Sequence, residues 1–206
     1  MQWRVLVPIK HGAPAKTRLR GATGEQAQHA ELVRAIQLDT LDAVLALGSH
    51  PLLGGLFVVS GRPAAALPAE IEILRDGGAG LNAALAGAAT ELARRYPGDG
   101  VMAMVGDLPA LRPADLLTVL HEAPVTGRSF VRDADGSGTT LLAAAPGSAL
   151  TPRFGPDSAS RHLASGAVEL DAADSLRCDV DSASDLQRCL RLGVGMLTSQ
   201  LVVDLV

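Results

Sequence analysis

Short, mostly apolar runs alternate with longer segments of helical periodicity along roughly the first 120 residues of this 206-residue chain. The apolar runs have the length of strands and are residues 5–9, 54–60, 71–74 and 100–105. The segments with apolar residues at helical spacing are residues 24–47 and about 82–95. Apolar runs without polar alternation are typical of strands buried on both faces. The pattern therefore predicts an α/β chain with a mostly parallel, Rossmann-like sheet and helices on both faces, a three-layer α/β/α fold.

The second half of the chain continues with shorter elements. A helix is predicted to begin at Pro113, because proline is well placed in a first helical turn. Further predicted elements are strands near 129–131 and 139–143 and helices at 158–165 and 182–192. The apolar tail at residues 201–206 could form an edge strand, a core strand or a contact in a homodimer. No internal repeat or linker divides the sequence, so residues 1–206 are predicted to form a single domain.

Composition and charge exclude several classes of function. The net charge is −4 and aromatic residues make up 2%, so the chain lacks the basic stripe and the stacking surface expected for binding nucleic acid. No apolar run approaches the ~20 residues of a membrane span, and the amino terminus is too interrupted for a signal peptide. Cys178 and Cys189 are too few for a disulfide framework or a metal cluster, and they fit a reducing, cytoplasmic compartment.

Three cations follow the first predicted strand. Lys10, Lys16 and Arg18 lie in a loop of small residues at the carboxyl end of that strand, where open parallel sheets bind ligands. Positive charge at this position suits a nucleoside triphosphate, although a solvated basic loop gives the same pattern. The spacing is not that of a Walker A loop, and no dinucleotide fingerprint is present. The loops after residues 71–74 and 100–105 are expected to share one crevice with this loop.

Asp107 directly follows Gly106 at the end of the apolar run 100–105. A carboxylate at the end of a central strand is costly unless it binds something. Mg²⁺ commonly takes one or two carboxylates together with phosphate oxygens, so Asp107 is a candidate metal ligand. The alternative is a turn aspartate that caps the helix near Pro113.

Asp179 and Asp181 are the candidate partners of Asp107. If residues 177–182 form a strand, both carboxylates lie on the same side, where they repel each other unless a cation or a proton intervenes. Asp181 also stands at an ordinary helix start, so a helix cap is the alternative for that residue. Asp179 is the better candidate for a metal ligand.

Three further segments offer polar groups to anions or bases. Residues 135–140 and 155–162 are rich in Gly, Ser and Thr, which supply N–H groups, hydroxyls and a helix amino terminus for holding phosphate or carboxylate. Ordinary turns have the same composition. Gly80 and Asn82 open a predicted helix, where they could hydrogen-bond a base edge or merely cap the helix. The five histidines show no metal-ligand spacing and no nucleophile elbow is visible, so a covalent mechanism is disfavoured.

Six segments in order resemble the MobA-like branch of the nucleotidyltransferases. More closely, the chain resembles the family of 2-phospho-L-lactate and phosphoenolpyruvate guanylyltransferases of coenzyme F-420 biosynthesis. The matching segments are residues 7–10 with 15–19, 80–85, 106–111, 135–142, 154–162 and 179–186. Each motif is short, but together they cover nearly the whole chain without a large gap. The resemblance implies transfer of GMP from GTP to a small phosphorylated C3 acid, with release of diphosphate.

The resemblance also assigns roles to residues. The residues implied to hold the acceptor acid are Thr140, Gly155 and Ser158. The implied Mg²⁺ ligands are Asp107, Asp179 and Asp181. The residues implied to contact GTP are Lys10, Lys16, Gly80 and Asn82. The implied catalytic residues are Asp107, which would act through the Mg²⁺ that it binds, and Lys16 and Arg18, whose positive charges would stabilise the reacting phosphates.

Other activities fit the same residues. A nucleotidyltransferase that acts on the molybdenum cofactor or on a sugar phosphate would share the nucleotide half of the site. A non-catalytic nucleotide-binding protein on this scaffold is the alternative from a different class. Among C3 acids, phosphoenolpyruvate, 2-phospho-L-lactate and 3-phosphoglycerate differ by one double bond or one hydroxyl, which the shape of a pocket can distinguish. Closer similarity to the bacterial form of the family favours phosphoenolpyruvate.

Overall fold

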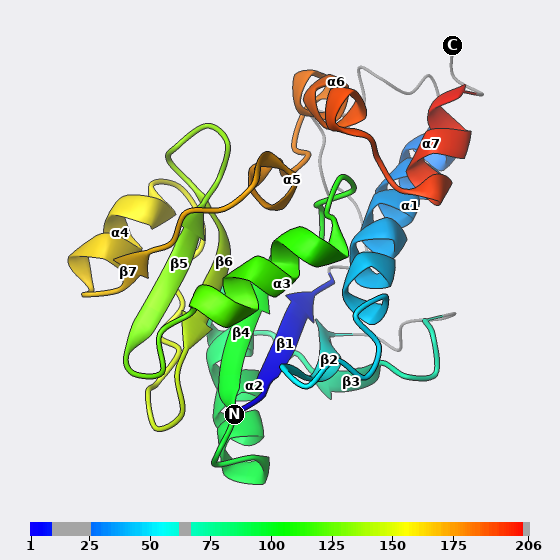
Figure 1. The fold of residues 1–206 in the computed structure, drawn as a ribbon. Coiled ribbons are helices and arrows are strands. Elements are labelled where there is room, and N and C mark those ends of the chain that lie inside the picture. Colours follow the sequence, from blue (N-terminus) through cyan, green and yellow to red (C-terminus); the bar gives the residue numbers. More distant parts are fainter. Residues whose placement is uncertain (10–25, 62–66, 204–206) are drawn as a thin grey trace.

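A computed structural model describes residues 1–9, 26–61 and 67–203 of the chain. Seven strands form one sheet in the order β3-β2-β1-β4-β6-β5-β7 (Figure 1). The strands are β1 (Trp3–Pro8), β2 (Leu53–Ser60), β3 (Glu72–Arg75), β4 (Gly100–Met104), β5 (Arg128–Arg132), β6 (Thr139–Ala144) and β7 (Val168–Glu169). Within the described residues, β6 alone runs antiparallel to its neighbours, so the sheet is mostly parallel as predicted.

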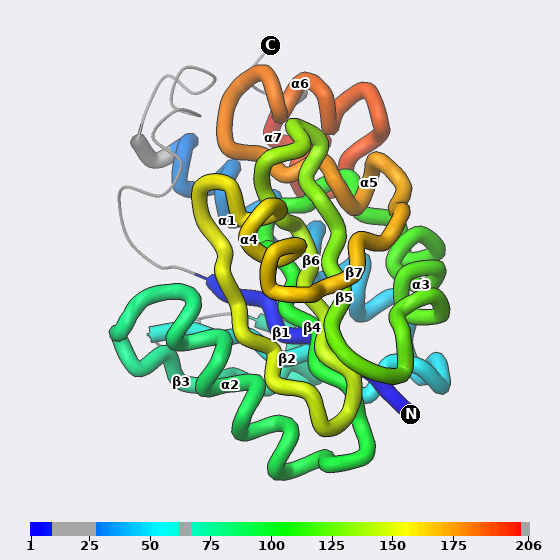
Figure 2. The backbone as a smooth tube through the Cα atoms, turned by 90° about the vertical axis from the view of Figure 1, so that its left-hand side faces the viewer, coloured from blue at the N-terminus to red at the C-terminus, as the bar shows by residue number. Residues whose placement is uncertain are grey.

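Helices cover both faces of the sheet. They are α1 (Gln26–Leu45), α2 (Leu81–Arg95), α3 (Pro113–Glu122), α4 (Ser158–Ala164), α5 (Asp174–Arg177), α6 (Ala183–Leu192) and α7 (Met196–Val203). Side chains of α1, α3 and α5 pack on one face, and those of α2 and α4 pack on the other. Figure 2 shows α3 and α2 on opposite sides of the sheet, which confirms the three-layer architecture. None of the helices in the described ranges has both the length and the apolar character needed to cross a membrane.

The two cores follow from the alternation of side chains along the central strands. In β1, Val5 and Val7 are buried in the core shared with α1 and α3, whereas Leu6 is buried in the core shared with α2 and α4. Successive residues of a strand point to opposite faces, so a strand covered by helices on both sides has no position for a solvated side chain. Residues 5–8 of β1 are an uninterrupted apolar run for this reason, whereas Arg4 near the start of the strand forms an ion pair with Asp99 (2.6 Å).

A third, smaller core lies beyond the carboxyl edge of the sheet. It joins Ile36 of α1 with Val180, Leu186 and Cys189 in and around α6. Both Cys189 and Cys178 are buried free thiols. This core attaches the last part of the described chain to α1, close to the strand ends (Figure 1).

The apolar tail forms a helix rather than a strand. The expectation of a strand at residues 201–206 is therefore wrong for residues 201–203, which belong to α7, while the rest of the tail lies outside the described residues. The physical reason is a contact from α1, where the Asp39 carboxylate accepts hydrogen bonds from Leu197 N (3.1 Å) and Thr198 N (2.7 Å). A carboxylate at a helix amino terminus satisfies N–H groups that have no partner in the helix and so favours the helical state.

Gly195→Ala is expected to lower the free energy of unfolding by about 1–3 kcal/mol. A Cβ at this position would lie within 3.0 Å of the Asp39 carboxylate, and the Gly195 N–H already donates to Pro109 O (2.8 Å). Urea unfolding measures the change. Gly87→Ala is the matched control, because nothing lies within 4 Å of a Cβ at that position on α2, and this variant should be neutral or slightly stabilising. Equal unfolding midpoints for Gly195→Ala and the wild type would contradict the close contact with Asp39.

Candidate active site

The carboxyl edge of the sheet gathers polar residues that are far apart in the sequence. The parallel strands β1, β4 and β5 end at this edge, and the antiparallel β6 begins there. Asp107 follows β4, Asp133 follows β5, and Thr140 lies at the start of β6. The segment between α5 and α6 runs past the same edge, because the Val180 N–H donates to Asp107 O (3.1 Å). The fold therefore brings the Asp107 loop and residues 179–181 together.

Close packing and a buried hydroxyl fix the loop that carries Asp107. A Cβ on Gly106 would lie 3.1 Å from Val7 Cγ1, so glycine allows the loop to approach β1 closely. The Leu108 N–H donates to the hydroxyl of Thr40 on α1 (2.9 Å), and Thr40 is fully buried. The backbone on either side of the Asp107 carboxylate is therefore held by partners from β1 and α1.

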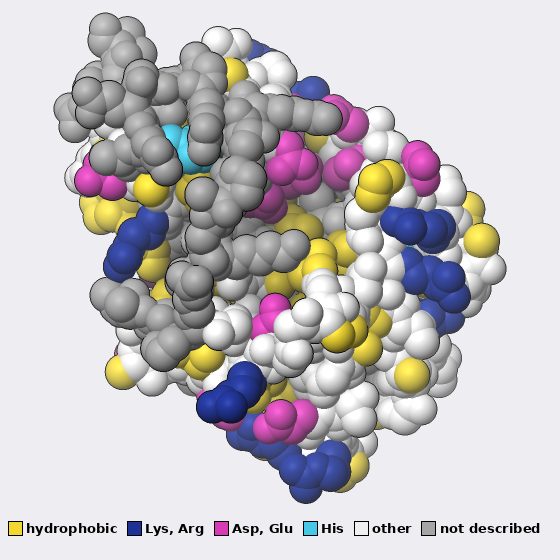
Figure 3. Space-filling view, turned by 180° about the vertical axis from the view of Figure 1, so that it is seen from behind, with side chains coloured by type: hydrophobic (Ala, Val, Ile, Leu, Met, Phe, Trp, Pro, Cys, Tyr) yellow, Lys and Arg dark blue, Asp and Glu magenta, His cyan; other side chains and the backbone are white. Residues whose placement is uncertain are grey.

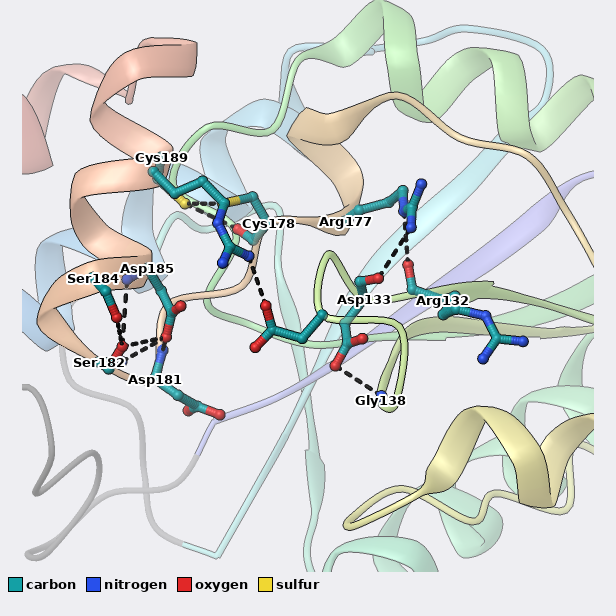
Figure 4. A network of polar contacts seen from close by, with 12 residues as sticks. Arg132, Asp133, Gly138, Arg177, Cys178, Asp181, Ser182, Ser184, Asp185 and Cys189 are labelled. Carbon is teal, nitrogen blue, oxygen red and sulfur yellow. Dashed lines mark hydrogen bonds and ion pairs between the residues drawn. The ribbon is translucent and has the colours of Figure 1, made fainter.

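Neither Asp107 nor Asp181 is a helix cap. The N-cap position of α3 is Arg112, so the alternative role of Asp107 as the cap of that helix is wrong. The N-cap of α6 is Ser182, whose hydroxyl accepts from Asp185 N (3.3 Å) while the Asp185 carboxylate accepts from Ser182 N (2.9 Å), which is a capping box. Asp181 precedes this capping box (Figure 4), so the cap alternative is wrong for Asp181 as well.

The segment that carries Asp179 and Asp181 is not a strand, so the expected alternation of the two carboxylates is wrong. Residues 178–180 have no regular secondary structure and connect two helices. The Asp179 N–H donates to Arg177 O (3.2 Å), which turns the chain at this point. A ladder needs a neighbouring strand with several consecutive backbone hydrogen bonds, and this segment is not assigned to a strand; the Val180 N–H donates to the loop after β4.

Carboxylates at this edge nevertheless act on one another through their charges. The pKa of Asp179 is raised to about 8, first by burial and then by the negative charges of Asp107, Asp181 and Asp133. A group of mutually repelling carboxylates is the electrostatic property expected of a site that binds a cation. Seen from behind, several acidic side chains gather in the upper part of the molecule (Figure 3).

Asp133 is a carboxylate that the sequence did not single out. Its Oδ2 accepts from Gly138 N (2.8 Å; Figure 4), and a Cβ on Gly138 would clash with the same carboxylate. Its Oδ1 is buried and has no hydrogen-bond partner within the described residues. The glycine-rich turn after β5 pointed to this region in the sequence, but the acid within that turn is Asp135. In the structure, Asp135 forms an exposed ion pair with Arg188 (2.9 Å).

The residues expected to hold the acceptor acid lie where β6 meets α4. Thr140 is fully buried, and its Oγ1 has no hydrogen-bond partner among the residues that the structure describes. The Ser158 hydroxyl is also buried and donates to Thr139 Oγ1 (3.1 Å). Gly155 has a φ of 119°, a conformation that favours glycine. Of the two candidate hydroxyls, Thr140 thus keeps its hydrogen-bonding capacity for a ligand.

A buried neutral histidine supports the start of α4. The Nε2 atom of His162 accepts from Arg153 N (3.0 Å), which leaves the proton on Nδ1, 2.9 Å from Thr139 Oγ1. Burial lowers the pKa of His162 to about 4, helped by the positive charges of Arg128, Arg161 and Arg153. The imidazole is therefore uncharged at neutral pH and serves as a structural hydrogen-bonding bridge.

The two candidates for the nucleobase, Gly80 and Asn82, have different surroundings. Gly80 is the N-cap of α2 with a φ of 94°, and nothing lies within 4 Å of a Cβ at this position, so open space adjoins it. The Asn82 amide is bonded to the backbone of Phe154: Phe154 N donates to Oδ1 (2.8 Å) and Nδ2 donates to Phe154 O (3.0 Å). Gly80 occupies the cap position, so this segment does cap the helix, whereas Asn82 lies inside the helix and is not its cap.

The donor set at this edge fits Mg²⁺. Carboxylate oxygens are the hard ligands that Mg²⁺ prefers, and nucleotide enzymes usually bind it through one or two carboxylates plus phosphate oxygens. Within the described residues, no three His, Cys, Asp or Glu side chains are placed to hold a metal ion together, so the three expected carboxylates do not form a complete metal site by themselves. The candidate cations of the triphosphate loop, which lie outside the described residues, are Lys10, Lys16 and Arg18.

Solved structures of other proteins share the fold of this chain. The structure of 4-diphosphocytidyl-2C-methyl-D-erythritol synthase matches with a TM-score of 0.61 at 12% identity, over 93% of this chain and 98% of the other. A nucleotidyl transferase from Methanothermobacter has a TM-score of 0.58 at 19% identity, over 92% of this chain and 98% of its own. Rv0371c of Mycobacterium tuberculosis, solved as a manganese complex, has a TM-score of 0.53 at 24% identity, over 92% and 98%. These similarities show that the protein shares its α/β fold with these structures.

Sequence relatives identify both the class, which is that of the nucleotidyltransferases, and the family. The phosphoenolpyruvate guanylyltransferase of Streptomyces coelicolor is 46% identical over 100% of this chain and 98% of its own length. The phosphoenolpyruvate guanylyltransferase of Streptosporangium roseum is 43% identical over 97% of this chain and 90% of its own. The chain belongs to the phosphoenolpyruvate guanylyltransferase family. No protein-family model matches the sequence.

Proposed function

We propose that the protein transfers GMP from GTP to phosphoenolpyruvate and releases diphosphate. The product would be enolpyruvyl-2-diphospho-5′-guanosine, for use in coenzyme F-420 biosynthesis. The observation that carries the proposal is the group of mutually repelling carboxylates around Asp179, at the edge where open α/β sheets bind their ligands. Full-length similarity to relatives named for this activity supports the choice of substrates. GTP, phosphoenolpyruvate and free thiols are all compatible with the cytoplasm, the proposed location.

The proposed reaction depends on positioning more than on proton transfer. A phosphate oxygen of the acceptor forms a bond to the α-phosphorus of GTP. The bond from that phosphorus to the oxygen bridging the α- and β-phosphates breaks, and diphosphate leaves with the electron pair. The attacking phosphate is already anionic, so no strong general base is required. Holding two polyanions in line is therefore the main task of the protein.

Asp107, Asp179 and Asp181 are proposed to hold a divalent cation, with Mg²⁺ as the ion. When bound, the cation neutralises charge that develops on the leaving diphosphate. The manganese complex of Rv0371c provides a precedent for a divalent ion on this fold. The part played by the chain itself is to fix the carboxylates, and the hydrogen bonds from Val180 and to Thr40 do this through the backbone of the Asp107 loop.

The remaining roles are also proposals. Thr140, Gly155 and Ser158 would contact the acceptor acid, and the free hydrogen-bonding capacity of Thr140 Oγ1 among the described residues supports this. Gly80, which adjoins open space at the start of α2, would lie beside the nucleobase in the same segment as Asn82. The triphosphate would be contacted by Lys10, Lys16 and Arg18.

Diphosphate release tests the proposed function. Purified protein is supplied with GTP and Mg²⁺ together with phosphoenolpyruvate, 2-phospho-L-lactate or 3-phosphoglycerate in separate reactions. Release that requires phosphoenolpyruvate is the expected result. Release with another of the acids alone would keep guanylyl transfer but change the acceptor. If GTP binds by calorimetry and none of the three acids supports release, the proposed activity is wrong.

A further inference from the structure

Asn82 forms a bidentate pair with the backbone of Phe154, which lies 72 residues away in the sequence. Its Oδ1 accepts from Phe154 N at 2.8 Å, and its Nδ2 donates to Phe154 O at 3.0 Å. Residues 151–154 have no regular secondary structure, so no strand satisfies the polar groups of this backbone. The amide of Asn82 does so instead, as a neighbouring strand would.

We propose that Asn82 is a positioning residue for the acceptor loop, residues 153–155, rather than a reader of the guanine edge. The inference rests on the proposed function, in which Gly155 contacts the acceptor acid. Recognition of a base edge by an amide uses its oxygen and its nitrogen together. In Asn82 both atoms are engaged by the residue that immediately precedes Gly155.

Contacts with α4 hold the other side of the acceptor loop. Arg153 N donates to His162 Nε2 (3.0 Å), and Ser158 N donates to Gly155 O (3.1 Å). The ring of Phe154 packs edge-on against the ring of His162, with centroids 5.5 Å apart. Loss of the Asn82 pair therefore leaves the loop attached to α4 but removes its link to α2. The expected defect is a misplaced Gly155 in a folded protein.

The same pair connects the two halves of the proposed site. α2 begins directly after Gly80, which is proposed to lie beside the nucleobase, and Asn82 is the second residue of that helix. If the start of α2 moves when GTP binds, the hydrogen bonds between Asn82 and Phe154 would transmit that movement to Gly155.

Steady-state kinetics of Asn82→Ala and Asn82→Asp test this role. The first variant removes both hydrogen bonds, and the second keeps an acceptor for Phe154 N but sets a carboxylate oxygen against Phe154 O. Both should raise the KM for phosphoenolpyruvate by about tenfold or more, while the KM for GTP and the preference for GTP over ATP stay within about twofold of wild type. Thr90→Ala is the matched control, because Thr90 is exposed on α2 and donates to Ala86 O of its own helix.

Two results would overturn the inference. Loss of the preference for GTP over ATP with an unchanged KM for phosphoenolpyruvate would mean that Asn82 reads the base. Unchanged constants for all substrates would mean that the pair with Phe154 does not position the loop. Calorimetric titration of GTP and of ATP into each variant measures base preference without turnover. If the wild type releases no diphosphate, the proposed function fails, whereas an intact GTP preference in the Asn82 variants still shows that Asn82 does not read the base.

Discussion

Asp107→Asn is expected to lower the turnover of diphosphate release by about 10²-fold or more while leaving the fold intact. Asparagine has nearly the same volume as aspartate but no charge, so it is a poor ligand for a divalent cation. The contacts that hold the loop, from Val180 N to Asp107 O and from Leu108 N to Thr40 Oγ1, do not involve the side chain of Asp107. Steady-state diphosphate release measures the effect, and thermal unfolding measures the fold.

Asp135→Asn provides the matched control for this prediction. Asp135 lies in the turn between β5 and β6, and its side chain is 65% exposed in an ion pair with Arg188. Exposed ion pairs contribute little, so the same change of charge should alter turnover by less than about twofold. If Asp107→Asn turns over at nearly the wild-type rate, Asp107 has no part in the mechanism.

The elements that were predictable from the sequence are those whose signals are local. Residues 5–8 of the buried strand β1 form an apolar run because helices cover both faces of the strand. The helix expected to begin at Pro113 does so, because the ring of proline sets the backbone for a first turn. The helix expected at residues 182–192 begins after Ser182, whose capping box with Asp185 is present in the sequence as Ser-x-x-Asp.

Elements that depend on distant contacts were not predictable. α7 is capped by Asp39, which precedes Thr198 by 159 residues, so no local pattern distinguishes this helix from an apolar strand. β7 consists of Val168 and Glu169, which is too short for a period, and it is defined by pairing with β5. In both cases the structure follows from a partner that becomes a neighbour only after the chain has folded.

The same limit explains which carboxylates of the candidate site were found. Asp107 could be identified because it directly follows an apolar run. Asp133 could not, because its position depends on β5 lying beside β6 and β6 lying beside β4. Asp179 was identified from its spacing with Asp181, but through a strand that does not exist. What relates these residues is their position at the carboxyl edge, where burial and then the negative charges of the neighbouring carboxylates raise the pKa of Asp179, rather than alternation along a strand.

Asp179→Asn is expected to stabilise the metal-free protein at pH 8 while lowering turnover by about 10²-fold or more. The pKa of Asp179 is about 8 in the folded protein, compared with an ordinary value of 3.8. Between these values the folded state binds more protons than the unfolded state, so the contribution of this group to stability is present at about pH 4 and is lost as the pH rises to 8. Asparagine does not titrate, so the variant should exceed the wild type by about 1–3 kcal/mol at pH 8, with roughly 2–4 °C in Tm for each kcal/mol.

Thermal unfolding of the wild type and of Asp179→Asn in a chelator, at pH 5 and at pH 8, distinguishes two effects of the substitution. One is relief of the repulsion on the Asp179 carboxylate, and the other is a simple loss of packing. At pH 5 only a small part of the contribution of the wild-type carboxyl has been lost, so the two proteins should differ less than at pH 8, and the difference should grow as the pH rises. Added Mg²⁺ at pH 8 should then stabilise the wild type more than the variant, because a ligand that binds the folded state stabilises it in proportion to its affinity. A variant that is less stable than the wild type at pH 8 in the chelator would mean that Asp179 is held by favourable contacts rather than opposed by its neighbours. Equal stabilisation of both proteins by Mg²⁺ would remove Asp179 from the proposed ligands and leave the cation to Asp107 and the other carboxylates of this edge.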